Sequence, residues 1–157
     1  MYKQDGHEIF VIDGHMHLWD ASPENWRNKN GEAWIKCFYD YHKGLSPTDE
    51  VWPFEKFCKY GEETLISDLF LNGYADMGIL NSTYLYEFYK NGFNSHRQNN
   101  AIKQKYPDRF ILCGAFDPRA EEAGLDEFRQ MVEEYPIQGL KLYTAEWRNG
   151  SRGCCSG

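Results

Sequence analysis

The sequence predicts an α/β fold built on a parallel β-sheet. Short apolar runs bounded by Gly, Pro, Asn or Asp recur along the chain, and segments with helical periodicity lie between the later runs. Parallel neighbours need a crossover of about a dozen or more residues, which this spacing supplies. We therefore expect about four βα units that form one domain over residues 1–157.

The apolar runs define four predicted strands. Their sequences are IFVIDGH, YADMGIL, FILCGAF and IQGLKLY, which have the length and composition of buried strands. The predicted strands lie near residues 9–16, 74–80, 110–116 and 138–143.

Three helices are predicted between the strands. The segment that starts at about Glu121 has one apolar stripe and an acidic opposite face. Its stripe consists of Leu125, Phe128, Val132 and Tyr135. Residues 95–106 begin with Ser95, a candidate cap, and stop before a proline. Residues 62–72 form the third predicted helix, with Gly73 as its stop signal.

The connection over residues 19–60 departs from this rhythm because it is long and rich in aromatic residues. Turn signals at Ser46-Pro47 and Trp52-Pro53 indicate an irregular insertion after the first strand. A loop of this length in a compact domain usually has a functional task. Its aromatic residues are Trp26, Trp34, Phe38, Tyr39, Tyr41, Trp52, Phe54 and Phe57.

The composition and charge of the chain argue against nucleic acid and membranes as its partners. The chain carries a formal net charge of -7 and has no cluster of Lys and Arg, so it offers no electrostatic footprint for nucleic acid or an anionic membrane. No segment approaches the ~20 apolar residues of a membrane span. We expect a soluble, cytoplasmic protein that acts on a small molecule.

The cysteines favour a reducing compartment. There are five of them, and Cys37, Cys58 and Cys113 are far apart without a CxxC pair, which argues against disulfides and thiolate zinc sites. Cys154 and Cys155 are adjacent in the tail, where an unstructured end is the simpler interpretation than a ligand pair.

The sharpest chemical signal is the pair His15 and His17 at the carboxyl end of the first predicted strand. Residues i and i+2 of a strand point to the same face, so two imidazoles can reach one ion. Asp13 lies on the same face and could hydrogen-bond a ligand or the neighbouring backbone as a supporting group. A chance HxH in a chain with five histidines is the alternative.

Three segments in order resemble one enzyme family. VIDGHMHLWD resembles the first strand of the amidohydrolase-related (amidohydrolase family 2) metal-dependent barrel enzymes, the group that includes aminocarboxymuconate-semialdehyde decarboxylase. KYPDRFILCGAFDPR resembles that family's third strand and its approach, and GLKLYTAEW resembles the fourth. The resemblance extends to about Arg152.

The resemblance implies a (β/α)8 TIM barrel that holds one divalent metal, usually zinc, with His15 and His17 as the first two ligands. The family takes its other site residues from the fifth, sixth and eighth strands, which have no counterpart here. A full barrel takes ~250 residues. We therefore expect the N-terminal half of a barrel, which is catalytically incomplete and has a divergent tail at residues 153–157. The truncation would be either natural or an error of the gene model.

Three further residues are candidates for the substrate pocket. Trp19 follows the histidine pair closely, and Lys141 lies on the fourth predicted strand. Some two-metal relatives carry a carboxylated lysine at this strand, but a structural or substrate-facing ammonium is the favoured interpretation of Lys141. Glu146 could reach the site from the next loop or lie on the surface. The aromatic insertion either forms a substrate wall or packs onto the barrel.

The implied activity is metal-dependent hydrolysis or nonoxidative decarboxylation of a substrate with a carboxylate or carbonyl. Three alternatives stay open: a noncatalytic fragment that binds metal poorly, a half-barrel that needs a partner chain, and a small α/β binding domain. Exposed sheet edges in a half-barrel also predict self-association. His42 and His96 are expected to be hydrogen-bonded or exposed rather than ligands.

Overall fold

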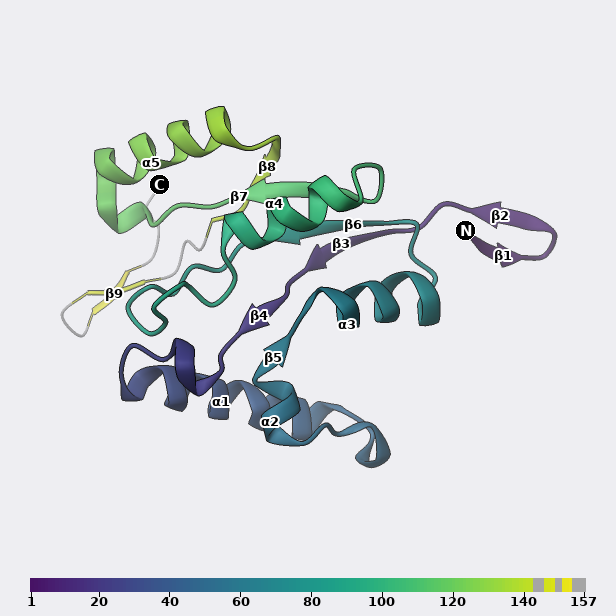
Figure 1. The fold of residues 1–157 in the computed structure, drawn as a ribbon, viewed down its shortest axis with the longest axis horizontal. Helices are drawn as coiled ribbons and strands as arrows, with labels where there is room; N and C mark the ends of the chain where they lie inside the picture. The colour runs from purple at the N-terminus through teal and green to yellow at the C-terminus, as the bar shows by residue number, and fades with distance from the viewer. Residues whose placement is uncertain (143–145, 149–150, 154–157) are drawn as a thin grey trace.

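A four-stranded parallel sheet forms the centre of the protein in a computed structural model, which describes residues 1–142, 146–148 and 151–153 (Figure 1). The strand order follows the chain order. The predicted α/β class with a parallel sheet is therefore confirmed. The strands are β3 (Ile12–Met16), β6 (Met77–Asn81), β7 (Phe110–Gly114) and β8 (Ile137–Leu140).

Three helical segments connect these strands. α3 (Glu62–Ile66) continues as a π-helix over Ser67–Asn72, and α4 (His96–Lys105) and α5 (Glu121–Glu134) both contact β7. The main core packs between the sheet and α3 and α4, because each element turns its apolar residues toward the others. This core consists of Leu18, Leu65, Leu69, Leu80, Ile102, Phe110 and Leu112.

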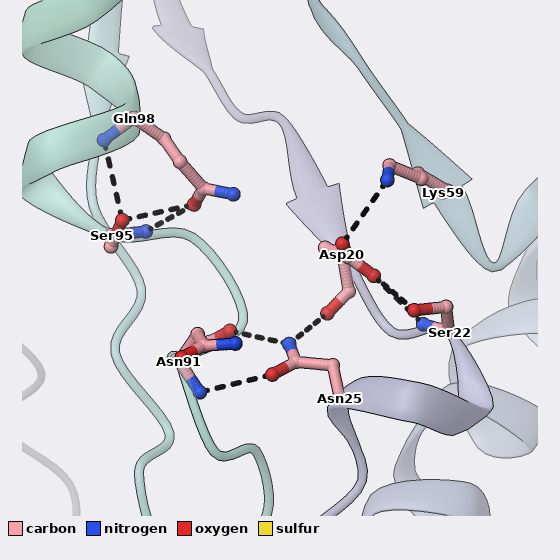
Figure 2. Close-up of polar contacts among 8 residues, drawn as sticks. Asp20, Ser22, Asn25, Lys59, Asn91, Ser95 and Gln98 are labelled. Atoms are coloured by element: carbon pink, nitrogen blue, oxygen red, sulfur yellow. Dashed lines mark hydrogen bonds and ion pairs between the residues drawn. The ribbon is translucent and has the colours of Figure 1, made fainter.

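The start of α4 is fixed by a capping box. The Ser95 hydroxyl accepts a hydrogen bond from the Gln98 backbone N–H at 3.3 Å, and the Gln98 side-chain oxygen accepts one from the Ser95 N–H at 2.9 Å (Figure 2). Two N–H groups that the helix leaves without partners are thereby satisfied. The loop that precedes α4 therefore ends at a defined residue.

The segment between β3 and α3 is not the irregular loop that its turn signals indicated. Its longest element is a 17-residue helix, α1. Asn28 caps this helix by accepting a hydrogen bond from the Asn30 N–H at 2.9 Å, and Pro47 follows its end. The elements are β4 (Trp19–Asp20), a 3-10 turn (Pro23–Asn25), α1 (Lys29–Leu45), a second 3-10 turn (Thr48–Glu50), α2 (Phe54–Phe57) and β5 (Lys59–Tyr60).

A second core joins the segment between β3 and α3 to the loop over residues 82–94. Tyr89 is fully buried, and its hydroxyl donates to the Gly31 carbonyl oxygen of α1 at 2.7 Å. Trp26 forms an isolated β-bridge with Tyr89. Several aromatic residues of this segment thus pack against one another and the loop. The buried members of this core are Ala21, Ile35, Phe57, Cys58, Tyr89 and Phe93.

The segment between β3 and α3 and the N-terminal hairpin lie at opposite ends of the sheet (Figure 1). The hairpin consists of β1 (Tyr2–Gln4) and β2 (His7–Ile9), with positive φ at Asp5 and Gly6 of the turn. The predicted first strand, near 9–16, is thus divided between β2 and β3.

After β8, β9 (Glu146–Arg148) and β10 (Ser151–Gly153) pair antiparallel. Cys37, Cys58 and Cys113 are free, and Cys154 and Cys155 lie outside the described residues, as does the tail beyond Gly153. Among the helices described, none combines the length and the apolar character that a membrane span requires.

Candidate metal centre

His15 and His17 converge at the carboxyl end of β3. Their Nε2 atoms are 2.9 Å apart, and their ring centroids are separated by 4.8 Å. The pairing of β3 with β6 is irregular between Asp13 and Met16, and such irregularities redirect side chains. Asp13 Oδ1 accepts a hydrogen bond from the His15 backbone N–H at 3.0 Å, so this carboxylate supports the irregular part of β3.

The second ring nitrogen of His17 faces the neighbouring strand. His17 Nδ1 is 2.8 Å from the Asn81 carbonyl oxygen at the end of β6, and the Thr83 hydroxyl oxygen lies 3.4 Å away. A carbonyl oxygen only accepts hydrogen bonds, so Nδ1 carries the proton. The Nε2 atom of His17 is therefore left with a lone pair that points toward His15.

Lys141 directly follows β8 and brings a cation to the same point. Its Nζ atom is 2.7 Å from His15 Nε2 and 3.1 Å from His17 Nε2. An ammonium group only donates hydrogen bonds, so both imidazoles turn lone pairs toward one positive charge. The two Nε2 lone pairs thus have the convergent arrangement that a bound cation requires.

The spacing of these donors can be compared with that of zinc ligands. Two nitrogens at 2.0 to 2.1 Å from a tetrahedral zinc ion are about 3.3 Å apart. The Nε2 atoms of His15 and His17 are 2.9 Å apart, so small rotations of the rings would bring them to ligand distance. The two histidines therefore fit a divalent ion in place of the Lys141 ammonium.

The environment keeps His17 in the form that binds metals. Burial lowers the pKa of His17 to about 4, and the Lys141 ammonium acts in the same direction, while the hydrogen bond to Asn81 opposes the shift. His17 is consequently neutral at pH 7, and a metal ion would not have to displace a proton from it.

A cavity of about 520 Å³ opens beside the histidine pair. Trp19 lies in its wall, stacks on Tyr60 at 4.9 Å between ring centroids, and donates its indole N–H to the Phe57 carbonyl oxygen at 2.7 Å. Most of the lining is aromatic or apolar, and part of it comes from α1. The lining residues are His15, Met16, His17, Trp19, Trp34, Phe38, Tyr60, Thr83 and Phe93.

The structure thus brings together His15, His17 and Lys141, with Trp19 in the adjoining wall. The Glu146 backbone belongs to β9, while its side chain lies outside the described part of the chain. Sequence reasoning missed Asn81 and Thr83. The available signal was a polar triplet, Asn81 to Thr83, directly after a predicted strand, where parallel sheets present functional groups.

His42 and His96 do not line the cavity beside the histidine pair. The His42 ring stacks on Phe57 at 4.8 Å and accepts a hydrogen bond from the Trp52 backbone N–H. His96 Nδ1 is 2.7 Å from the Ser82 hydroxyl oxygen, and its Nε2 donates to the Ala115 carbonyl oxygen at 3.1 Å. Both rings therefore have structural hydrogen bonds.

Acid should destabilise the protein through His96. Burial lowers the pKa of His96 below its ordinary value of 6.5, and its hydrogen bond to Ala115 offsets only part of this shift. The unfolded chain therefore takes up a proton first as pH falls. We expect the free energy of unfolding to keep its full value above about pH 6.5. Below that pH it should fall by up to about 1.4 kcal/mol per pH unit for each such histidine.

Urea unfolding at pH 7.5, 6.0 and 5.0 measures this loss, in a range where carboxylates stay ionised. His17 contributes in the same direction, so His96→Gln should reduce the slope without removing it. A pH-independent midpoint in the unmodified protein would contradict the prediction.

Within the described residues, no group of three or more His, Cys, Asp or Glu side chains could hold a metal ion.

The amidohydrolase family model matches residues 12–153, a range that contains the histidine pair and Lys141. No curated protein and no solved structure matches the chain. Because the match covers most of its length, the chain belongs to the amidohydrolase family.

Proposed function

We propose that His15 and His17 bind one divalent ion, zinc, in a metal-dependent hydrolase or nonoxidative decarboxylase. One observation carries this proposal: two imidazole lone pairs converge on a single cation, with Nε2 atoms 2.9 Å apart. Zinc suits neutral imidazole ligands. Members of the amidohydrolase family are generally metal-dependent enzymes, which supports the same assignment.

The chain's own residues suggest how a substrate would bind. A bound ion would polarise a substrate carbonyl or carboxylate and lower the pKa of a coordinated water toward ~7. The Asn81 carbonyl group orients the His17 ring. The Lys141 ammonium, once displaced from the two imidazoles, would pair with a substrate carboxylate. Trp19, together with the aromatic side chains around it, would hold the apolar part of the substrate.

We further propose that the sheet is the N-terminal half of a (β/α)8 barrel of the aminocarboxymuconate-semialdehyde decarboxylase type. Four parallel strands in chain order, joined through helices, match the repeating unit of such a barrel. The two outer strands carry exposed apolar residues, Ile12 at 48% and Leu140 at 47%. Strands from elsewhere would cover these edges and supply the remaining ligands, either from the same protein or from a partner chain.

A noncatalytic role is the second candidate function. Two histidines without a third protein ligand make a poor zinc site. The described side chains contain no group of three His, Cys, Asp or Glu ligands. A chain with this site alone would bind zinc weakly and would not retain a full equivalent.

Calorimetric titration of the whole chain with Zn²⁺ tests the proposal. We expect weak binding of one ion per chain, and zinc well below one equivalent after dialysis. His15→Ala and His17→Ala should each abolish the binding. His7→Ala is the matched control, because His7 is exposed on β2 at the other end of the sheet.

Two results would overturn the proposed site. Binding that persists in both His15→Ala and His17→Ala would place the ion elsewhere, and equal loss in His7→Ala would indicate nonspecific chelation. Tight stoichiometric binding by the unmodified chain would instead exclude the weak, two-ligand site and show that further residues complete it.

A further inference from the structure

A fully buried asparagine contacts the same carbonyl group as His17. Asn94 is 0% exposed, and its Nδ2 donates to the Asn81 carbonyl oxygen at 2.9 Å. That oxygen also lies 2.8 Å from His17 Nδ1. We propose that Asn94 is a positioning residue that fixes the Asn81 carbonyl, so that His17 keeps its proton on Nδ1 and presents Nε2 to the metal ion. This inference rests on the proposed metal-binding function.

The backbone of Asn94 is held as firmly as its side chain. Asn94 and Thr83 form an antiparallel bridge, with N–H to carbonyl distances of 2.8 and 3.0 Å. Asn94 therefore closes the loop between β6 and α4 back onto the end of β6. Its side chain reaches residue 81 while its backbone holds residue 83, so the exit of β6 is restrained on both sides of Ser82.

The orientation of the Asn94 amide follows from its partner. The Asn81 carbonyl oxygen only accepts, so the NH2 group of Asn94 must face it. Asn94 Oδ1 accepts no hydrogen bond within the described part of the chain. The donor end is consequently the part of this side chain that acts on the site.

Thr83 shows why the orientation of the Asn81 carbonyl matters. The Thr83 hydroxyl oxygen lies 3.4 Å from His17 Nδ1, and a hydroxyl can donate as well as accept. If the Asn81 carbonyl turned away, Thr83 could donate to Nδ1 and move the ring proton to Nε2. That tautomer cannot bind a metal through Nε2. The Asn94 hydrogen bond therefore favours the tautomer that can act as a ligand.

The test compares two equally buried asparagines in the full chain. Asn99 is 2% exposed, and its Nδ2 donates to the Ser82 hydroxyl oxygen at 3.0 Å rather than to Asn81. Ring ¹⁵N chemical shifts of the metal-free labelled protein report the His17 tautomer, and calorimetry with Zn²⁺ reports affinity. The comparison is made in a Lys141→Met background, because the Lys141 ammonium also faces His17 Nε2 and would by itself favour the Nδ1–H form. In that background we expect Asn94→Ala to give mixed tautomers and about 10- to 100-fold weaker binding. Asn99→Ala should leave both within about twofold.

A second variant guards against a simple loss of folding, which circular dichroism detects. Asn94→Ser keeps a polar group that is too short to reach the Asn81 carbonyl, and it should also give mixed tautomers. Adding Thr83→Val removes the competing hydroxyl and should restore the Nδ1–H form. A purely structural role for Asn94 predicts no such rescue.

Three results would overturn the inference: an unchanged His17 tautomer in the Asn94 variants, an equal change in Asn99→Ala, or no rescue by Thr83→Val. The tautomer is read without metal, so failure of the proposed function has a separate signature. If the unmodified chain bound no Zn²⁺, the metal site would be refuted, while the tautomer comparison would still decide the role of Asn94.

Discussion

Replacing Asn25 with alanine should lower the free energy of unfolding by about 3 kcal/mol. Asn25 is 4% exposed, and its Nδ2 donates to the carbonyl oxygens of Asp20 and Gly92 at 2.6 and 2.9 Å. Its Oδ1 accepts a hydrogen bond from the Asn91 N–H at 2.9 Å (Figure 2). The variant leaves these three backbone groups without their partner, and the Gly92 carbonyl among them is buried. Urea unfolding followed by circular dichroism measures the change.

Asn28 provides the matched control. It is exposed, its Nδ2 donates to the Glu87 carbonyl oxygen at 2.8 Å, and its Oδ1 caps α1. Asn28→Ala should cost only about 1 kcal/mol, because water can reach the groups that it leaves. Similar losses for the two variants would contradict the argument, since the burial of Asn25 and of the Gly92 carbonyl is its basis.

The alternation of strands and helices could be predicted because a buried strand requires a short apolar run, which is easily recognised in the sequence. β6 and β7 lie in the middle of the sheet, and each appears in the sequence as a short apolar run bounded by polar or turn residues. The apolar residues of α5 likewise recur at helical spacing in the sequence. The parallel arrangement then follows from the length of the connections between strands.

α1 escaped prediction for an equally physical reason. Only Gly31 and Ile35 of its 17 residues are buried, so the helix carries no continuous aliphatic stripe. Gly31 also lowers helix propensity, yet the contact with the loop requires it: a Cβ atom there would lie 2.7 Å from the Phe88 carbonyl oxygen. Tyr39 and His42 lie on the same helix face as Gly31 and Ile35, so a helical spacing is present in the sequence. It is easily overlooked because Ile35 is the only aliphatic residue among these four.

The candidate site was partly predictable. The spacing of His15 and His17 gave a common face, but the 2.9 Å approach also depends on the irregular pairing of β3, which the sequence does not signal. Lys141 reaches His15 across 126 positions, so that contact requires the whole sheet to form. The contribution of Asn81 comes from a backbone carbonyl, whose role is independent of its side chain.

Replacing Lys141 with glutamate should convert the weak site into a strong one. Lys141 Nζ lies 2.7 and 3.1 Å from the two Nε2 atoms, so a carboxylate on this side chain would reach the same ion as His15 and His17. The variant removes a competing positive charge and adds a third protein ligand. We expect Zn²⁺ to bind at least ~100-fold more tightly than to the unmodified chain, measured by competition with a chromophoric chelator.

Lys141→Met separates the two causes, because it removes the charge without adding a ligand. Loss of repulsion alone should tighten Zn²⁺ binding by less than about tenfold in a partly exposed site. The difference between Lys141→Glu and Lys141→Met then measures the third ligand. If the two variants bound Zn²⁺ equally, a carboxylate at this position would not reach the ion, and the point on which His15, His17 and Lys141 converge would not be the metal position.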